Sequence, residues 1–329
     1  MNMKDEILRY SKELGLNTVG FIKCRRFEEL EEELKYRKSE KIENEFEEKD
    51  IDKRINPFSY MEDGKTIISI AFPYRCEDEG YGEVYFSSYT RRLDYHRVVL
   101  KYLNRICDFI EKEFKGKAIA MVDSNGLPER YIASLSGIGF IGKNNMVITK
   151  EYGSYVFLGE IITNLSMDQY DDEGVPKAED PCGNCDICLK KCPTAAINKV
   201  RTMPNRCMSY ITQQKDIEEG WIKVMDGRLF GCDDCQRYCP YNLKAKFTSL
   251  EEFKTLDFMN EPDIDELIYM DNKLFKEKYS NTSCGWRGKA LLQRNAIIAK
   301  AIKKNNRDID NKRLTSPKVI SCYELIKNL

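Results

Sequence analysis

The sequence feature that most constrains the fold is a cysteine run at residues 182–193, CGNCDICLKKCP. Its spacing, C-x2-C-x2-C-x3-C-P, is typical of bacterial ferredoxins, in which three thiolates bind one four-iron cluster and the fourth reaches a second cluster. A zinc site rarely combines this spacing with the trailing proline, and the chain has one histidine, which excludes most Cys/His zinc patterns. The run therefore predicts two [4Fe-4S] clusters.

A second motif, FGCDDCQRYCPYN at residues 230–242, supplies only three further cysteines, so one ligand is missing. Cys207, in NRCMSYIT between the motifs, is the nearest candidate in sequence. The exchange pattern of ferredoxins predicts one cluster bound by Cys182, Cys185, Cys188 and Cys239. The other cluster is then bound by Cys192, Cys207, Cys232 and Cys235. The remaining cysteines stand singly and are interpreted as small buried residues: Cys24, Cys76, Cys107, Cys284 and Cys322.

The composition is that of a folded globular protein, and 329 residues are enough for one large core or two smaller ones. The N-terminal residues are charged, and no run approaches the roughly 18 apolar residues of a membrane helix. We therefore expect a cytoplasmic protein with no membrane partner. Cytosolic thiols stay reduced, so the cysteines are expected to be metal ligands or core residues rather than disulfides.

The net charge of −1 conceals an uneven distribution. Residues 28–63 hold 14 Asp/Glu against 7 Lys/Arg, a net of −7, whereas residues 273–327 hold 14 Lys/Arg against 4 Asp/Glu, a net of +10. A basic stretch in a neutral chain is either a nucleic-acid footprint or an ordinary solvated helix surface. Charge alone slightly favours the solvated surface.

The order of patterns along the chain predicts three parts. Strand-like and helical segments alternate through residues 1–170, including a helix over 94–114 that starts from a possible Asp cap. Residues 28–50, dense in Glu, Lys and Arg, indicate a solvated helix or a mobile excursion. The cysteine motifs lie in 171–243. The last part, 244–329, is mostly helical, and its clearest amphipathic run is GWRGKALLQRNAIIAKAIKKN.

Two features near the middle of the first part concern possible sites. The segment GIGFIG (137–142) fits G-x-G-x-x-G, but it follows a helix and leads to a strand, the reverse of the order in dinucleotide-binding sites. We interpret it as a Gly-rich turn that permits close backbone approach. Asp123, in MVDSNGLPER, ends a predicted strand, where side chains commonly face a ligand crevice. Taken alone, an Asp at that position is more often a turn or cap residue.

Five segments occur in order: VDSNGLPERYIASLSGIGFIGKNNMVI, GSYVFLGEIITNL, PCGNCDICLKKCPTAAI, RCMSYIT and GCDDCQRYCPYN. Together they closely resemble the epoxyqueuosine reductases, cobalamin-dependent iron–sulfur enzymes of queuosine synthesis. The segments RINP, IISIAFPY and DYH extend the resemblance over roughly residues 50–242. The ferredoxin motif alone is generic, but joined to the segment from Asp123 to IGKN it is specific.

The resemblance implies an α+β fold with three domains: a nitroreductase-like cobalamin domain (1–170), a bacterial-ferredoxin-like two-cluster domain (171–243) and a short helical-repeat tail (244–329). The implied function is reduction of epoxyqueuosine to queuosine in tRNA, which is bound through its anticodon arm. Cobalamin and two [4Fe-4S] clusters are the implied cofactors. The electrons come from a low-potential donor such as a flavodoxin or ferredoxin.

The resemblance also implies site residues. Asp123 takes the role of proton donor, which requires burial to raise its pKa toward neutral. Residues in segments that line the cobalamin or substrate site are Arg54, His96, Asp123, Lys143, Asn144 and Ser209. DYHRVV lacks the glycine of the D-x-H-x-x-G signature, so we expect cobalamin bound without ligation by His96. The alternative for His96 is a helix-start histidine bonded to the backbone.

Two other functions remain open at this point. One is a ferredoxin-like electron carrier whose N-terminal part only docks a redox partner, and the other is a corrinoid-dependent reductase of a small molecule. Cobalamin binding would distinguish either reductase from the electron carrier. Binding of tRNA would distinguish an epoxyqueuosine reductase from a reductase of a small molecule. WRGKALLQRNAIIAKAI (286–302) resembles the start of the family's longer helical-repeat domain, and its Arg and Lys are expected to contact tRNA phosphates. A shortened tail implies weaker tRNA binding or another substrate.

Overall fold

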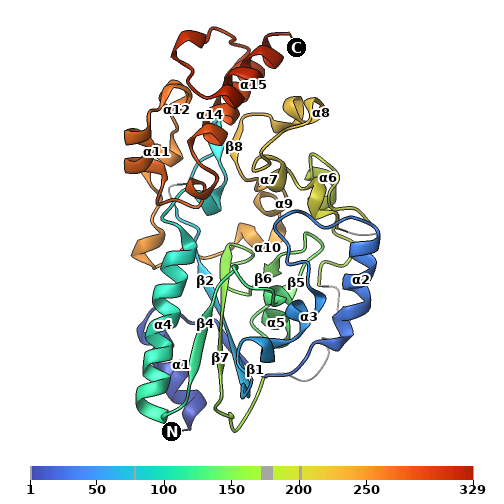
Figure 1. Cartoon of the computed structure of the whole chain (residues 1–329). Coiled ribbons are helices and arrows are strands. Elements are labelled where there is room, and N and C mark those ends of the chain that lie inside the picture. The colour runs from blue at the N-terminus through green and yellow to red at the C-terminus, as the bar shows by residue number, and fades with distance from the viewer. Residues whose placement is uncertain (1, 78, 172–180, 200–201, 329) are drawn as a thin grey trace.

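The computed structural model describes residues 2–77, 79–171, 181–199 and 202–328. It is a mixed structure of helices and strands, with the main sheet in the lower half of Figure 1 and the C-terminal helices in the upper half. Within the described residues, no helix is long and apolar enough to cross a membrane.

The main sheet has four antiparallel strands in the order β1-β2-β7-β4. Their bounds are Val19–Lys23 for β1, Thr66–Pro73 for β2, Val156–Thr163 for β7 and Ala118–Met121 for β4. The two long central strands pair over eight residues, from Thr66 opposite Thr163 to Pro73 opposite Val156. Every residue of β2 is buried, since helices cover both faces, and this explains its almost continuous apolar sequence.

Helices from the same half of the chain cover the two faces of this sheet (Figure 1). On one face are α1 (Met3–Glu13) and α4 (Tyr95–Phe114), and on the other is α5 (Glu129–Leu135), with α2 (Glu31–Ser39) and α3 (Ile51–Ile55) on the same side. The expected Asp cap of the long helix is confirmed, because the Asp94 side chain accepts a hydrogen bond from the backbone N–H of His96.

The Gly-rich segment forms the tight hairpin of β5 (Phe140–Ile141) and β6 (Val147–Ile148). A Cβ atom at Gly139 would lie 2.7 Å from the backbone oxygen of Ile148, and Gly137 has a φ of +73°. The interpretation as a turn that needs close backbone approach is therefore confirmed.

The cysteine motifs lie on short helices beside this hairpin. These are α6 (Ile187–Lys191), α7 (Met208–Ile211), α9 (Asp234–Arg237) and α10 (Pro240–Leu243), whereas α8 (Glu219–Ile222), between the motifs, lies farther up in Figure 1. A parallel strand pair joins β3 (Tyr85–Phe86), which follows β2 in the chain, to β8 (Arg228–Phe230), which leads into the second motif.

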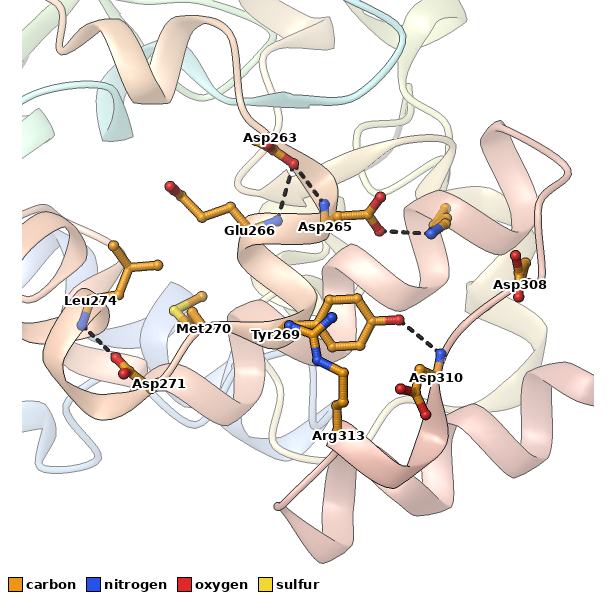
Figure 2. A pocket seen from close by; sticks show the side chains of 11 residues that line it. Asp263, Asp265, Glu266, Tyr269, Met270, Asp271, Leu274, Asp308, Asp310 and Arg313 are labelled. Carbon is orange, nitrogen blue, oxygen red and sulfur yellow. Dashed lines mark hydrogen bonds and ion pairs between the residues drawn. The ribbon is translucent and has the colours of Figure 1, made fainter.

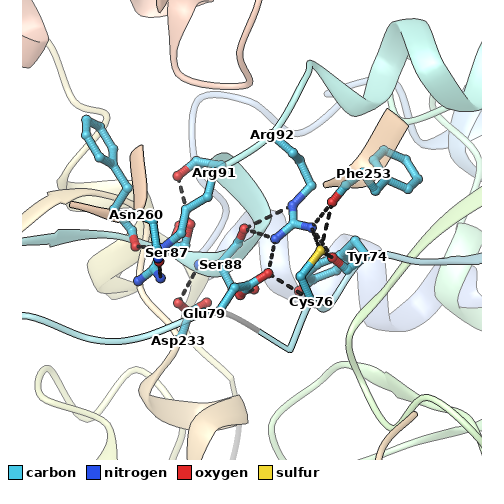
Figure 3. Close-up of polar contacts among 12 residues, drawn as sticks. Tyr74, Cys76, Glu79, Ser87, Ser88, Arg91, Arg92, Asp233, Phe253 and Asn260 are labelled. Atoms are coloured by element: carbon cyan, nitrogen blue, oxygen red, sulfur yellow. Dashed lines mark hydrogen bonds and ion pairs between the residues drawn. The ribbon is translucent and has the colours of Figure 1, made fainter. Parts of the chain in front are cut away.

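A buried polar cluster reinforces this junction (Figure 3). The guanidinium of Arg92 is fully buried, pairs with Glu79 and donates to the backbone oxygen of Phe253 at 2.6 Å. The backbone N–H of Ser88 donates to Asp233, between two cluster cysteines, at 2.7 Å. Buried charges are stable only when they are paired and hydrogen-bonded, so this cluster fixes the sheet, the second cysteine motif and the C-terminal part to one another.

The C-terminal part is helical, as expected. Its helices are α11 (Asp257–Asn260), α12 (Ile264–Tyr269), α13 (Asn272–Leu274), α14 (Lys289–Ile298) and α15 (Pro317–Lys327). The expectation that the run containing α14 is amphipathic is wrong, because residues 291–298 of that helix are all buried. The helix forms the centre of this part, packed between its neighbours and the strand β8.

The polar residues of α14 are buried because they bind backbone carbonyls. Arg294 donates to the carbonyl oxygens of Gln214 at 2.6 Å and Lys215 at 3.0 Å. Asn295 donates to those of Thr212 at 2.8 Å and Leu229 at 2.7 Å. The expectation that arginine in this run contacts tRNA phosphates is therefore wrong for Arg294, which holds the C-terminal helices to the cysteine-rich region.

Candidate active site and cluster-binding region

Asp123 lies two residues beyond the end of β4, in a loop that joins the sheet to α5. Its φ of +47° is the left-handed conformation, which is uncommon for residues other than glycine. Its side chain is 55% exposed. A cavity of about 540 Å³ lined by Phe46, Tyr60 and Asp123 lies on one side. On another side, a cavity of about 230 Å³ places Asp123 together with Tyr95 and Gln236.

A third cavity, of about 410 Å³, is lined by His96, Tyr60, Ser124 and Asn125. The three cavities share residues of the loop 123–125, so this loop stands where they meet. The cavity of about 230 Å³ is also lined by aromatic rings and reaches Gln236, which directly follows Cys235. The loop therefore faces a space that extends toward a cysteine motif.

His96 forms hydrogen bonds with two carboxylates. Its Nε2 lies 2.9 Å from Oδ2 of Asp123, and its Nδ1 lies 2.8 Å from Oδ1 of Asp94. Desolvation acts to lower the pKa of His96, but the bonds with Asp123 and Asp94 outweigh it and raise that pKa to about 9. The imidazole is therefore charged at neutral pH. Its partners are carboxylates, so the alternative of a histidine bonded through its ring to the backbone is wrong.

The pKa of Asp123 moves in the opposite direction. Desolvation acts to raise it, but hydrogen bonds from His96 and Tyr95 outweigh desolvation and hold the pKa of Asp123 below its usual value. The expectation that burial raises this pKa toward neutral is wrong for this arrangement. At neutral pH the proton of the pair is on His96, and Asp123 is the carboxylate that faces the cavities.

Tyr95 supports this pair and was not singled out from the sequence. Its hydroxyl donates to Oδ2 of Asp123 at 2.7 Å. Its ring stacks on His96 with centroids 4.1 Å apart and on Phe157 with centroids 4.3 Å apart. The tyrosine therefore fixes both the imidazole and the carboxylate. The only sequence signal for Tyr95 was its position beside His96 in the segment DYH.

The expected ligands of one cluster surround a single cavity. It measures about 240 Å³, and its lining includes all four cysteines of what we call the first thiol set: Cys182, Cys185, Cys188 and Cys239. Burial and then the neighbouring Cys182 thiol raise the pKa of Cys188. Cys182 and Cys185 likewise act to raise the pKa of Cys239. The four sulfurs thus interact with one another.

The other four cysteines, the second thiol set, also lie together: Cys192, Cys207, Cys232 and Cys235. Burial, followed by Cys207 and Cys232, raises the pKa of Cys235 well above its usual range. Burial raises the pKa of Cys207, on which Cys192 also acts. Among the described residues, no three His, Cys, Asp or Glu side chains are arranged to hold a single metal ion.

Lys143 and Asn144, expected near the cofactor or substrate, contact the cysteine motifs. Lys143 Nζ donates to the backbone oxygens of Gly183 and Cys185, and it lines the cavity of the first thiol set. Asn144 donates to the backbone oxygen of Cys235 at 3.1 Å. The hairpin that carries both residues therefore joins the two motifs.

Arg54 and Ser209 lie in different surroundings. The guanidinium of Arg54 forms ion pairs with Glu43 at 3.2 Å and Glu47 at 3.4 Å, and its side chain is 16% exposed. Ser209 follows Cys207 and hydrogen-bonds the hydroxyl of Tyr89, which lines the cavity of about 230 Å³ with Asp123. Arg54 thus anchors the segment that borders the larger cavity, and Ser209 supports the wall of the smaller one.

An exposed aromatic cluster borders the cavity of about 540 Å³. It consists of Phe46, Tyr210 and Trp286, with ring centroids 5.2 Å apart for Phe46–Tyr210 and 5.3 Å apart for Phe46–Trp286. Trp286 is 58% exposed and Phe46 41% exposed. The guanidinium of Arg287 lies over both of these rings. Three distant segments of the chain thus place aromatic faces and a cation beside the Asp123 loop.

A cavity in the C-terminal helices, of about 620 Å³, is larger than those around Asp123 but is strongly acidic (Figure 2). Six carboxylates line it, against Lys300 and Arg313. Lys300 pairs with Asp265 at 2.6 Å, and elsewhere Lys303 pairs with Asp226 at 2.8 Å. Much of the basic charge of this part is therefore neutralised by acidic partners, and this cavity repels phosphate.

The remaining cysteines are placed outside the two sets. Cys107 and Cys284 are buried, whereas Cys24, Cys76 and Cys322 are only partly buried. The interpretation as buried core residues is thus confirmed for two of the five.

Residues that sequence reasoning missed include Tyr60, Glu129 and Gln236. The hydroxyl of Tyr60 accepts the backbone N–H of Gly126 at 2.7 Å, and Tyr60 lines two of the three cavities. Glu129, in the PER of the segment that follows Asp123, accepts the backbone N–H of Asp123. Gln236 is 4% exposed and lies on the cavity wall toward Cys235.

Two protein-family models match the chain. The model described as "Epoxyqueuosine reductase QueG, DUF1730" matches residues 54–124, which include the His96–Asp123 pair. The model described as "4Fe-4S double cluster binding domain" matches residues 181–242, which include both thiol sets. The second match supports two [4Fe-4S] clusters.

Similar proteins cover almost the whole chain. An epoxyqueuosine reductase of Listeria monocytogenes is 33% identical over 98% of this chain and 84% of its own length. One of Bacillus subtilis is 36% identical over 91% of this chain and 79% of its own length.

Solved structures agree. A crystal structure of epoxyqueuosine reductase with an epoxyqueuosine-modified tRNA-Tyr stem loop has a TM-score of 0.90 and 33% identity, covering 98% of this chain and 89% of that one. A Bacillus subtilis structure, whose aspartate-bearing catalytic loop is swung out of the active site, has a TM-score of 0.88 and 32% identity over the same shares.

Proposed function

The chain belongs to the epoxyqueuosine reductase family, and we propose that it reduces epoxyqueuosine in tRNA to queuosine at the Asp123 loop. The observation that carries the proposal is the place of the His96–Asp123 pair. It faces cavities that open toward the exposed aromatic cluster on one side and reach Gln236, beside Cys235, on another. An oxidoreductase of this class needs a proton source, a place for the nucleoside and an electron path at one point, and this loop provides all three.

The space around Asp123 fits the cobalamin that the family resemblance implies. The cavity of about 230 Å³ is walled by aromatic side chains and ends at Gln236, and it shares Asp123 with the cavity of about 540 Å³. The flat faces of a corrin ring suit such walls. Both ring nitrogens of His96 are bonded to carboxylates, which supports binding of the cofactor without ligation by His96.

When bound, cobalamin supplies a reduced cobalt centre for chemistry at the epoxide carbon. The residues of the chain supply protons and orientation. Removing the epoxide oxygen to leave an alkene takes two electrons and two protons and releases water. The proton on Nε2 of His96 lies one hydrogen bond from Oδ2 of Asp123. That proton moves from His96 to Asp123 and on to the departing oxygen, the second proton comes from solvent, and the Tyr95 hydroxyl holds the carboxylate in place.

The loop that carries Asp123 has two positions, in our proposal. In the related Bacillus subtilis structure the corresponding catalytic loop is swung out of the active site. In this chain the loop is turned in, since Asp123 bonds His96 and Tyr95. An open loop admits the modified nucleoside, and a closed loop delivers the acid to it.

The thiol sets form a relay toward this loop. The second thiol set contains Cys235, the neighbour of Gln236 on the cavity wall. Exposed residues Gly183, Lys190 and Lys191 flank the first thiol set. Electrons therefore enter at the first cluster and leave from the second. The entry point suits an acidic, low-potential donor such as a flavodoxin or ferredoxin.

The tRNA is held beside the aromatic cluster of Phe46, Tyr210 and Trp286. Unstacked bases of single-stranded RNA are bound by aromatic faces, and this cluster offers such faces within reach of the cavity that contains Asp123. An anticodon arm placed there presents its modified nucleoside to the loop.

The domain division follows from the same arrangement. We propose that residues 1–170 form a nitroreductase-like cobalamin domain, 171–243 the two-cluster domain and 244–329 a short helical-repeat tail. The main sheet and its covering helices lie within the first range, and the double-cluster match falls within the second.

The experiment that tests the function uses anaerobically reconstituted protein with cobalamin, a chemical reductant and epoxyqueuosine-containing tRNA. Mass spectrometry of the digested tRNA is expected to show conversion to a nucleoside lighter by one oxygen atom. Turnover that requires cobalamin supports the proposal. Intact clusters with no cobalamin binding and no conversion would instead indicate an electron carrier.

A further inference from the structure

Two carboxyl groups near Asp123 are not used in the catalytic scheme above: Glu129, which is half-buried and lines the cavity of about 230 Å³, and Glu160, which is buried. Glu129 is the first residue of α5, and Glu160 is in the middle of β7, where it is 1% exposed. In the sheet, Glu160 is opposite Ser69 of β2 on one side and Met121 of β4 on the other. A carboxyl group in this position is unusual, since charged residues are rarely buried without a partner.

Glu129 holds the Asp123 loop by two hydrogen bonds to a single oxygen. Its Oε1 accepts the backbone N–H of Asp123 at 2.6 Å and the side-chain amide of Asn125 at 2.9 Å. Asn125 in turn accepts the backbone N–H of Leu127 at 2.8 Å. The loop needs such bonds because Asp123 has a left-handed conformation, which is unfavourable for a residue with a Cβ atom.

Glu160 holds Glu129 from the other side. Its Oε2 is buried and, among the described residues, accepts no hydrogen bond, while Ser69 approaches its Oε1 only at 3.4 Å. Burial and the adjacent Glu129 raise the pKa of Glu160 well above its usual range. Glu160 therefore stays protonated, and its O–H group is available to donate a hydrogen bond to Glu129.

The charges around Glu129 come from each element packed against it. Asp123 faces it from the loop, Tyr95 from α4, Glu160 from β7 and Arg130 from its own helix. Burial, followed by the charge of Asp123, raises the pKa of Glu129 to about 7. A protonated Glu160 lets Glu129 ionise beside Asp123 and accept hydrogen bonds as a carboxylate, which strengthens them.

We propose that Glu129 is the positioning residue that latches the Asp123 loop in its closed position, and that Glu160 is the buried proton donor that keeps Glu129 in place. The inference rests on the proposed function of Asp123 and adds a device that controls its position. Glu129 lines the cavity of about 230 Å³, but its hydrogen bonds go to the loop, so we expect it to act through Asp123, and cobalamin binding is measured for each variant. Release of its two bonds frees residues 123–125 to move away from His96.

The test measures the loop and the reaction separately. Hydrogen–deuterium exchange of the reconstituted protein reports the backbone N–H of Asp123, and turnover of epoxyqueuosine-containing tRNA reports the reaction. In Glu129→Ala we expect exchange of this segment to rise about 10- to 100-fold, as for loss of a charge-assisted hydrogen bond, and kcat to fall by a similar factor. The KM for tRNA is expected to stay within about twofold, because no substrate contact is lost.

Conservative variants distinguish loss of the loop's hydrogen bonds from general destabilisation of the fold. Glu129→Gln keeps an oxygen that accepts the N–H of Asp123, and Glu160→Gln keeps a donor toward Glu129, so both are expected to retain slow exchange and most of kcat. Asn125→Ala removes one of the two bonds and is expected to give an intermediate rise. Glu29→Ala is the matched control, since Glu29 accepts the hydroxyl of Tyr131, also on α5, away from the loop.

The latch would be overturned if Glu129→Ala exchanged at the wild-type rate. It would also be overturned if Glu129→Ala and Glu129→Gln lost equal amounts of kcat. Where Glu129→Ala fails to fold, Asn125→Ala decides by the same comparison. The exchange result stands even when the wild-type protein does not convert epoxyqueuosine, so failure of the latch and failure of the proposed function are distinguishable.

Discussion

The Nε2 atom of His96 lies 2.9 Å from Oδ2 of Asp123, and the imidazole is the charged member of the pair at neutral pH. Asp94 binds the other ring nitrogen at 2.8 Å. One imidazolium between two carboxylates stores a proton beside the cavity while both carboxylates stay ionised. In the proposed reaction the acid that serves the departing oxygen is the pair, with the proton on His96 and the point of delivery at Asp123.

The pair predicts an alkaline limit near the pKa of His96. That pKa is about 9 in the folded chain, above its usual value, so the stabilisation from the charged imidazole is complete below the unfolded value and is lost as the pH rises through about 9. We expect turnover to fall with one proton over the same range. Because His96 is the only histidine, an NMR titration of untagged protein labelled in histidine reports this pKa without assignment.

Asp123→Asn provides the check on this prediction. The variant removes one of the two carboxylates that raise the pKa of His96, so the titration is expected to move to lower pH. Turnover is expected to fall by at least about 100-fold, the usual contribution of a positioned acid, while both clusters and cobalamin are kept. A variant with full turnover, or an unchanged histidine titration, would contradict the role of the pair.

The sequence alone pointed to the cysteines and to Asp123 as site residues, but it did not point to Glu129 and Glu160, which lie beside Asp123. Motif spacing is set by the cluster, so both sets of ligands can be predicted from a single chain, and the structure brings the cysteines of each predicted set together. Glu160 lies within VFLGEIIT, where one Glu in an apolar run reads as a residue facing solvent. Only the pairing of β7 with two neighbours, which places Glu160 between Ser69 and Met121, shows that it is buried. The role of a buried carboxyl group such as Glu160 depends on its tertiary contacts, which a local sequence pattern does not contain.

The two thiol sets predict independent losses of iron. Cys239→Ser removes a ligand of the first set and Cys207→Ser one of the second, so each variant is expected to hold about four iron atoms in place of about eight. Iron analysis and EPR of the anaerobic, reduced proteins measure this. Cys322→Ser, outside both sets and partly buried, is the control and is expected to keep the full complement. Equal iron in Cys207→Ser and the wild type would exclude Cys207 as a ligand.

The C-terminal part shows why net charge and helical periodicity gave a wrong expectation of an amphipathic, phosphate-binding helix. The run around α14 has a helical pattern, but its polar side chains reach backbone carbonyls of neighbouring segments and not water. Many of the lysines that make residues 273–327 basic pair with acidic residues from elsewhere in the chain. Net charge along a sequence omits these partners, which only the fold brings together.

Arg294 is accordingly predicted to act on stability and not on tRNA binding. Arg294→Ala leaves the carbonyl oxygens of Gln214 and Lys215 without their donor, and we expect a loss of about 3 kcal/mol, as for hydrogen bonds to a charged group. Thermal unfolding is expected to begin several degrees lower. Arg307→Ala, at an exposed position of the same part, should unfold as the wild type does. A changed salt dependence of tRNA binding with unchanged unfolding would contradict the assignment.

The exposed aromatic cluster makes the last prediction, because Trp286 offers its face beside the cavity of Asp123. Stacking of a base on an aromatic ring contributes about 1–3 kcal/mol, so Trp286→Ala is expected to weaken binding of an epoxyqueuosine-modified stem loop about tenfold. The slope of affinity against salt should not change, since no phosphate contact is lost. Tyr238→Ala, which removes a 39% exposed ring beside the first thiol set, should bind normally. Equal affinity of both variants would place the anticodon arm elsewhere.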